Sequence, residues 1–76
     1  MLKREELTSR NSCLNRAADD EYLFVLRGHD IATPATIRFW AAERIRIGKN
    51  KPTDDQIVSA VRDADMLDRE NRGGDL

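Results

Sequence analysis

The sequence has 76 residues, of which 13 are basic and 14 acidic, for a net charge of −1. This length allows one small domain with a marginal core, and the balanced charge argues against strong nonspecific binding to nucleic acid. No apolar run approaches the roughly 20 residues of a membrane span, and the first residues lack the apolar core of a signal peptide, so we expect a cytoplasmic protein with no membrane partner.

Chains this short commonly need a further source of stability, such as a disulfide, a metal or a partner subunit. The single cysteine, Cys13, allows no internal disulfide, and with the single histidine, His29, it makes a poor zinc site. No glycine-rich phosphate loop is present, and no spacing indicates a nucleophile with its base. We therefore expect no metal, no cofactor and no enzymatic activity, and we expect stabilisation by assembly into a homo-oligomer.

The N-terminal third shows only short local signals. Residues 1–11 are polar and predict a loosely ordered segment with at most one helical turn around residues 5–7. Ser12 is a good N-cap for a short helix over residues 13–18. A single small helical domain is expected over residues 12–72, followed by a frayed tail at residues 73–76.

Residues 20–28 contain a continuous apolar run from Tyr22 to Leu26 that is rich in strand-forming residues. Periodicity alone does not separate a buried strand from a buried helical turn in such a run. Asp19 and Asp20 suit a helix N-terminus, Gly28 suits a stop, and no second strand-like run exists to pair with this one. We predict a helix here, with a strand as the alternative.

The next helix has strong signals at both ends. Thr33 is a capping residue, and Pro34 follows it at the first helical position. The helix is predicted to run to about Ile47 and to stop at Gly48.

Thr53 is predicted to cap the last helix, with Gln56 completing a capping box. The helix carries an apolar stripe at helical spacing, formed by Ile57, Ala60, Val61, Ala64 and Leu67. Because residues 49–52 make only a short connection, the two long helices should fold back on each other. The sequence therefore predicts an all-α protein in which short N-terminal helices precede an antiparallel helical hairpin.

Arg44 interrupts the apolar face of the helix that begins at Pro34. Projection at about 100° per residue places it near the middle of that face. One interpretation is that its stem covers apolar surface while its head reaches water or an aspartate. The other is a half-buried guanidinium that receives an anion, such as a carboxylate across a subunit interface or a phosphate. The apolar residues of the face are Ile37, Trp40, Ala41, Ile45 and Ile47.

Phe39 falls on nearly the opposite side of the same helix, where it is either a scattered exposed residue or an oligomer contact. The candidate phosphate-binding residues are the arginines Arg27, Arg38, Arg44 and Arg46. The candidate residues for base stacking or an interface are Tyr22, Phe39 and Trp40.

The segments S-C-L-N-R-A-A-D-D-E (12–21) and F-V-L-R (24–27), with Asp30, resemble a block found in short phage and prophage proteins. The resemblance implies a viral accessory protein in the host cytoplasm that counteracts host immunity stoichiometrically. It would either sequester a cyclic nucleotide signal, held by arginines at the joints between copies, or mask a host defence protein.

The segment D-I-A-T-P-A-T-I-R-F-W (30–40) resembles the turn and second helix of MerR-type helix-turn-helix regulators. That resemblance implies the alternative function of a small DNA-binding regulator, in which Thr36 and Arg38 face the DNA and residues 22–27 form the first helix. A structural or assembly protein of the virion is a further alternative.

Overall fold

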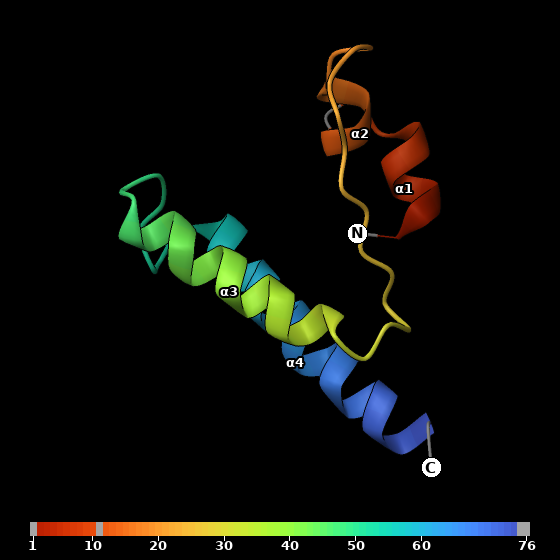
Figure 1. Cartoon of the computed structure of the whole chain (residues 1–76), viewed down its shortest axis with the longest axis vertical. Coiled ribbons are helices and arrows are strands. Elements are labelled where there is room, and N and C mark those ends of the chain that lie inside the picture. The colour runs from red at the N-terminus through yellow and green to blue at the C-terminus, as the bar shows by residue number, and fades with distance from the viewer. Residues whose placement is uncertain (1, 11, 75–76) are drawn as a thin grey trace.

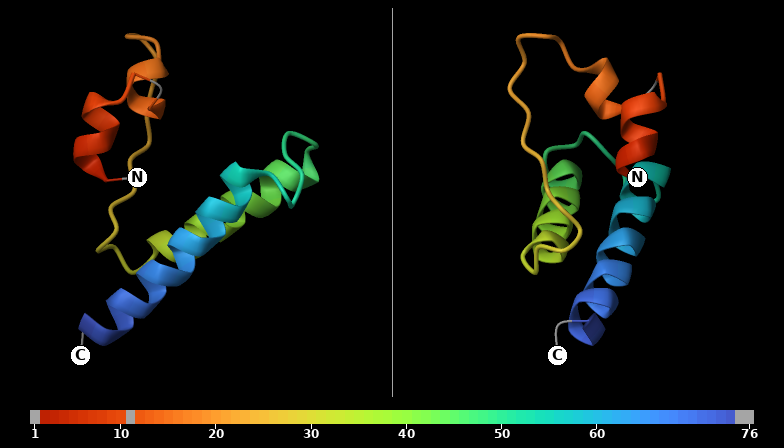
Figure 2. Two further views of the ribbon diagram at one scale, coloured as in Figure 1. Left: turned by 180° about the vertical axis from the view of Figure 1, so that it is seen from behind. Right: turned by 90° about the vertical axis from the view of Figure 1, so that its right-hand side faces the viewer.

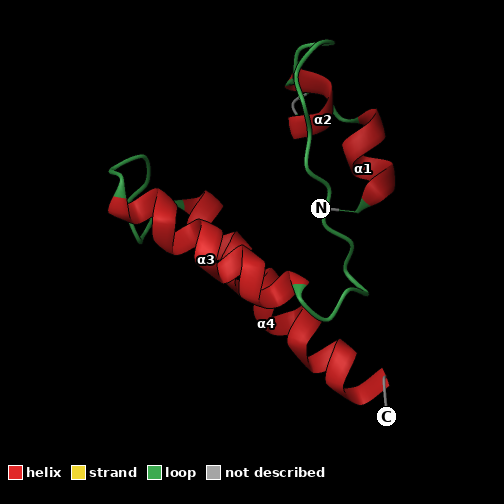
Figure 3. Ribbon diagram, viewed as in Figure 1, coloured by secondary structure: helices red, strands yellow, loops and turns green. Residues whose placement is uncertain are grey.

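The computed structural model describes residues 2–10 and 12–74, with side chains as far as Asn71. Its four helices are α1 (Lys3–Thr8), α2 (Cys13–Arg16), α3 (Thr33–Arg46) and α4 (Asp55–Gly74). The described residues form no strand (Figure 3), so the prediction of an all-α protein is confirmed. None of the helices in this part of the chain is long and apolar enough to cross a bilayer.

The helices pack as two separate pairs. α1 lies against α2 and α3 lies against α4, whereas no helix of one pair contacts a helix of the other. Figure 1 shows α3 and α4 side by side and joined at one end by residues 47–54, with a long irregular segment leading back to α2. The radius of gyration is 13.5 Å, compared with about 11.4 Å for a compact chain of this length. The molecule is therefore extended.

The α3–α4 pair contains the core of the molecule. Its most buried side chains are Pro34 and Ala41 on α3 and Ile57 and Ala64 on α4. Their spacing along each helix is close to the seven-residue repeat by which two helices present one narrow seam to each other. Two of the four are alanines, which leave room for the backbones to approach along this seam. Figure 2 shows the two helices running beside each other.

The predicted faces of α3 and α4 are only partly buried. On α3, Ala41 is buried and Ile37 and Ile45 are half-buried, whereas Trp40 and Ile47 are exposed. The projection predicts that all five belong to the core, and for Trp40 and Ile47 this prediction is wrong. The stripe on α4 is closer to expectation, with Val61 as its one exposed member.

The start of α3 differs from the prediction. Ala32, not Thr33, occupies the N-cap position, and Thr33 is the first helical residue. The hydroxyl of Thr33 donates a hydrogen bond of 2.7 Å to the carbonyl oxygen of Arg27 and is buried. Thr33 is thus already inside the helix, and its hydroxyl fastens the preceding segment to α3, which is a different role from the predicted cap.

The end of α3 follows the prediction at Gly48. This residue has φ of +78°, a conformation that glycine adopts without a steric penalty. Its N–H donates to the carbonyl of Ile45, and the N–H of Lys49 donates to the carbonyl of Arg44. These two bonds form a Schellman motif, which satisfies the last carbonyl groups of the helix.

The start of α4 is not the predicted capping box. The helix begins at Asp55, and Gln56 accepts a bond from the side chain of Asn50 instead of closing a box with Thr53. Asp54 makes the local contacts, because its carboxylate accepts from the N–H of Lys51 and the amide of Asn50. The helix extends to Gly74, past the predicted end at 72, and the last two residues of the predicted tail lie outside the described residues.

Residues 20–28 do not form the predicted helix. The chain from 21 to 27 is irregular and exposed throughout, and it contains neither helix nor strand. Five consecutive apolar residues would surround a helix on all sides, which is favourable only inside a core. Among the described residues this segment is exposed, so a helix here would gain no burial of its apolar side chains.

The N-terminal segment is more ordered than expected. α1 covers six residues where one turn is predicted, and Ser12 caps α2 as predicted by accepting from the N–H of Asn15. The side-chain amide of Asn15 donates to the carbonyl groups of Glu6, Leu7 and Ser9. These polar bonds, not apolar burial, hold α1 to α2. α2 ends at Arg16, two residues before the predicted end.

Candidate interaction surfaces

Arg44 lies at the closed end of the α3–α4 pair and is half-buried. Its Nε donates a 2.7 Å hydrogen bond to Oδ1 of Asn50. Its guanidinium carbon lies 5.7 Å from the centre of the Trp40 ring, a distance at which cation and ring attract. The guanidinium therefore has a partner within its own chain, and the first interpretation of Arg44 describes it better than a group that awaits an anion.

Asn50 extends this contact into a small polar network. Its side-chain amide donates to Asp54 at 3.0 Å and to Gln56 at 3.3 Å. The bonds that Asp54 accepts from the N–H of Lys51 and from Asn50 lower the pKa of its carboxyl below the ordinary value of 3.8. Sequence reasoning missed Asn50 and Asp54, although an Asn and an Asp four residues apart in a short turn are typical of side chains that bond to local backbone.

Arg38 bridges the two long helices. Its guanidinium lies 2.7 Å from a carboxylate oxygen of Asp65 and 2.7 Å from one of Asp68, both on α4. Hydrogen bonds to these two carboxylates raise the pKa of Arg38 above its ordinary value. A guanidinium that already contacts two carboxylates has little remaining attraction for a phosphate.

Arg46 is held locally. It forms an ion pair with Glu43, one turn earlier on α3, and both nitrogens of its fork contact the two carboxylate oxygens. This contact raises the pKa of Arg46.

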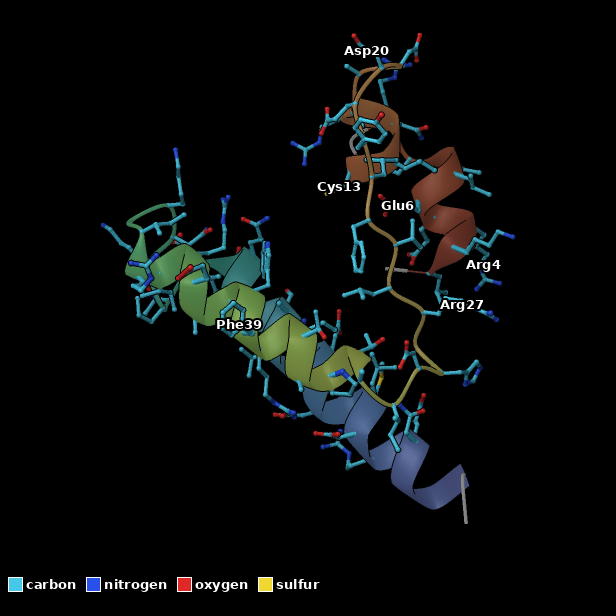
Figure 4. All side chains as sticks on the ribbon, viewed as in Figure 1. Arg4, Glu6, Cys13, Asp20, Arg27 and Phe39 are labelled. Atoms are coloured by element: carbon cyan, nitrogen blue, oxygen red, sulfur yellow. The ribbon has the colours of Figure 1, made fainter. Side chains whose placement is uncertain are left out.

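Arg27 is on the irregular segment, and Figure 4 shows its side chain pointing away from the ribbon. Among the described residues its guanidinium has no bonding partner. The four predicted phosphate-binding arginines thus lie at separate places, and three of them are bonded to side chains of the same chain. The phosphate site predicted from Arg27, Arg38, Arg44 and Arg46 is not assembled within one copy.

The aromatic candidates are exposed, but they do not lie in one group. On α3, Phe39 is 72% exposed and Trp40 39% exposed, and Figure 4 shows Phe39 standing off the outer side of the helix. Tyr22 lies on the irregular segment and is fully exposed. Phe39 and Trp40 are adjacent on α3 but point in different directions around the helix, and Tyr22 belongs to a different segment.

The second surface is the run from Tyr22 to Leu26, which we call the apolar segment. All five of its side chains are exposed, including Phe24 at 87%. Within the described part of the chain, no hydrogen bond reaches the backbone of residues 22–26. This segment combines the greatest apolar exposure in the molecule with unpaired peptide groups.

The C-terminal end of the apolar segment is anchored to the long helices. The side-chain amide of Asn71 on α4 donates to the carbonyl of Gly28 at 3.2 Å. A Cβ atom at Gly28 would lie 3.1 Å from Cδ2 of Leu67, so a larger residue here would need the Leu67 side chain to shift by a few tenths of an ångström. Together with the bond from Thr33 to Arg27, these contacts fix where the segment leaves the α3–α4 pair.

A shallow groove of about 380 Å³ follows one side of α4. It is apolar at its beginning, beside Pro52, and charged towards Arg69. The lining side chains on the helix recur at intervals of three and four, so they lie on one face of α4. This spacing is visible in the sequence and could have indicated the face. They are Ile57, Val58, Val61, Arg62, Asp65 and Arg69.

Comparison of the chain with protein-family models, with curated proteins and with solved structures found no match in any of the three.

Proposed function

We propose that this protein is a non-enzymatic accessory binding protein, of the kind found in phages and prophages, that counteracts host defence by masking a partner protein stoichiometrically. In this proposal α3 and α4 act as an antiparallel helical hairpin, and the outer side of α3 is the contact surface. The observation that carries it is the exposure of Phe39 and Trp40 on the helix pair that contains the core.

The surroundings of Phe39 support an anchor role. The neighbouring arginines Arg38 and Arg46 are already fixed by carboxylates, so they lose little conformational freedom when a partner covers them. An aromatic side chain on a rigid helix, flanked by charged pairs, has the composition of an interface centre with a polar rim.

Masking of a protein is favoured over sequestration of a cyclic nucleotide by the contacts of the arginines. A guanidinium binds phosphate through the free N–H groups of its fork, whereas Arg38 and Arg46 are paired with carboxylates and Arg44 is bonded to Asn50. A nucleotide site would therefore have to form at a joint between copies. The DNA-binding alternative lacks the helix over 22–27 that it requires.

The test begins with a search for the partner by affinity capture from a bacterial host lysate, using the wild-type chain and the Phe39→Asp variant as baits. A protein that only the wild type captures is then purified and mixed with the pure chain. We expect a complex of defined stoichiometry by calorimetry, at least tenfold weaker with Phe39→Asp, and unchanged in affinity with Arg62→Gln on the far helix. Binding that is insensitive to Phe39→Asp would contradict the proposal.

A thermal-shift assay separates the ligand classes. A ligand present at about 100 times its Kd stabilises the folded form by roughly 2.7 kcal/mol, which corresponds to a rise in Tm of about 10 °C or more for a chain of this size. We expect no such rise with cyclic oligonucleotides or duplex DNA. A rise with cyclic oligonucleotides would instead support sequestration, and a rise with DNA would support the regulator.

A further inference from the structure

We propose that residues 21–27 pair with the same residues of a second copy as a two-stranded antiparallel ribbon, and that this pairing forms a symmetric dimer. The inference concerns a different surface from Phe39 and does not depend on the proposed function.

The first argument is the state of the backbone. The apolar segment is irregular, exposed and without hydrogen bonds to its peptide groups among the described residues. An unpaired run of strand-forming residues is a template for pairing with another chain. Tyr, Phe, Val and Leu have side chains that pack well on such a ribbon, whereas lysine and proline, which commonly protect exposed edges, are missing from this run.

The second argument is charge complementarity. Glu21 precedes the apolar segment and Arg27 follows it. In an antiparallel pair centred on Phe24, Glu21 of each copy lies opposite Arg27 of the other, and opposite charges at facing positions stabilise a ribbon. A parallel pair would place Glu21 beside Glu21 and Arg27 beside Arg27, which is unfavourable. The charges thus fit a second copy in one orientation.

The apolar side chains fit the same register. Tyr22 lies opposite Leu26, Leu23 lies opposite Val25, and the two Phe24 rings meet at the two-fold axis. Because side chains alternate along a strand, Tyr22, Phe24 and Leu26 of both copies share one face. Such a contact is isologous, which means that each copy uses the same residues and that the assembly closes as a dimer.

The third argument is the amount of surface left uncovered. The chain exposes 6575 Å², whereas a compact monomer of 8.7 kDa exposes about 4,700 Å². The difference exceeds the roughly 800 Å² that each partner contributes to a stable protein interface. A two-stranded ribbon is marginal in water without further packing. The half of the chain that carries the segment also has exposed leucines that would pack on the ribbon in the dimer. They are Leu2, Leu7 and Leu14.

Reversal of the facing charges tests the register. We expect sedimentation of the wild type at micromolar concentration to show twice the mass of one chain. Glu21→Arg alone and Arg27→Glu alone each place like charges at both facing positions, so each should weaken dimerisation by roughly tenfold. The double variant should restore the wild-type dissociation constant, and an equimolar mixture of the two single variants should form a mixed dimer. Lys49→Glu, in the turn between α3 and α4, is the matched control and should change nothing.

Phe24→Asp tests the centre of the ribbon, because it brings two carboxylates together at the two-fold axis. We expect a monomer whose helical circular dichroism is retained, since the Phe24 side chain is 87% exposed. Retained helicity shows that the variant still folds. The proposal is overturned if the wild type is a monomer at 100 μM, if Phe24→Asp dimerises as well as the wild type, or if the single reversals do so. In the last case the copies pair in another orientation or through another surface.

Discussion

The α3–α4 pair and the apolar segment differ in how much of their apolar side-chain surface is buried. α3 and α4 bury Ala41, Ile57 and Ala64 between them, whereas the larger side chains of Tyr22 and Phe24 lie in water. Burial in this chain therefore follows the spacing of small side chains along two helices, not the apolar content of a segment. A contiguous apolar run offers no single face, and without a partner it stays uncovered.

The two regions also differ in their polar contacts. The turn between α3 and α4 is held by Arg44, Asn50 and Asp54, and its backbone groups are bonded through the Schellman motif. The apolar segment is anchored at Gly28, and among the described residues the backbone of 22–26 has no hydrogen bond. The first region is held by contacts within the chain, whereas the second leaves apolar side chains exposed, which a second copy would cover in the proposed dimer.

The largest effect is expected when the seam is disrupted. Ala64 is fully buried, so Ala64→Asp places an unpaired charge between α3 and α4 and should cost about 3 kcal/mol or more. We expect most of the helical circular dichroism at 222 nm to be lost at 25 °C. Ala42→Asp is the control, because Ala42 is exposed on α3 and the change there should cost less than about 1 kcal/mol. Equal effects at the two positions would show that the seam is not the core.

Arg44→Met should have the next largest effect. Methionine keeps the apolar stem but loses the bond to Asn50 and the contact with the Trp40 ring, and it leaves the Asn50 oxygen unpaired. A loss of about 2 kcal/mol in the free energy of unfolding is expected, measured by urea titration. Arg62→Met, an exposed arginine on α4, is the matched control and should be nearly neutral. If Arg44→Met is equally neutral, the guanidinium does not hold the turn.

Gly48→Ala should destabilise the α3–α4 pair by about 1 kcal/mol, since an L-residue with a Cβ atom is strained at positive φ. The space around a Cβ atom is open, so the cost is purely conformational. Urea titration measures it, and Lys49→Ala next to it should change stability by a few tenths of a kcal/mol at most. An Ala variant at 48 as stable as the wild type would mean that the turn adopts another conformation.

The smallest effect is expected in the pH dependence of stability, through the carboxyl of Asp54. Hydrogen bonds to its carboxylate lower the pKa of Asp54 in the folded chain below 3.8, so the stability that they contribute is complete above that value and is lost as the pH falls through the lowered pKa. We expect the free energy of unfolding to fall less steeply below about pH 4 in Asp54→Asn than in the wild type. Urea titrations at a series of pH values measure the slopes. Identical slopes would contradict a native role for the ionised carboxylate.

Local signals in the sequence identified the long helices well. Pro34 and Gly48 mark the ends of α3, and the spacing of Ile57 and Ala64 indicates the buried side of α4, because these signals depend only on nearby residues. The prediction of Thr33 as the N-cap is wrong. Its hydroxyl bonds to the carbonyl of Arg27, six residues earlier, and a local sequence pattern does not contain that acceptor.

The candidate site was harder to predict, because its contacts join distant residues. Arg38 meets Asp65 and Asp68 only after α3 and α4 pack, and helical projection treats each helix alone. Arg44 was recognised as unusual, but its partner Asn50 depends on the conformation of the turn. The prediction of a helix over the apolar segment is wrong, because composition alone does not indicate whether another part of the chain covers the segment.

The central claim, that a second copy covers the apolar segment, is tested most directly by isotope-filtered NMR on a mixture of labelled and unlabelled chains. The account predicts contacts between copies from Phe24 to Phe24 and from Leu23 to Val25, with slow amide exchange over residues 22–26. Absence of contacts between copies, with rapid exchange of these amides at millimolar concentration, would contradict it.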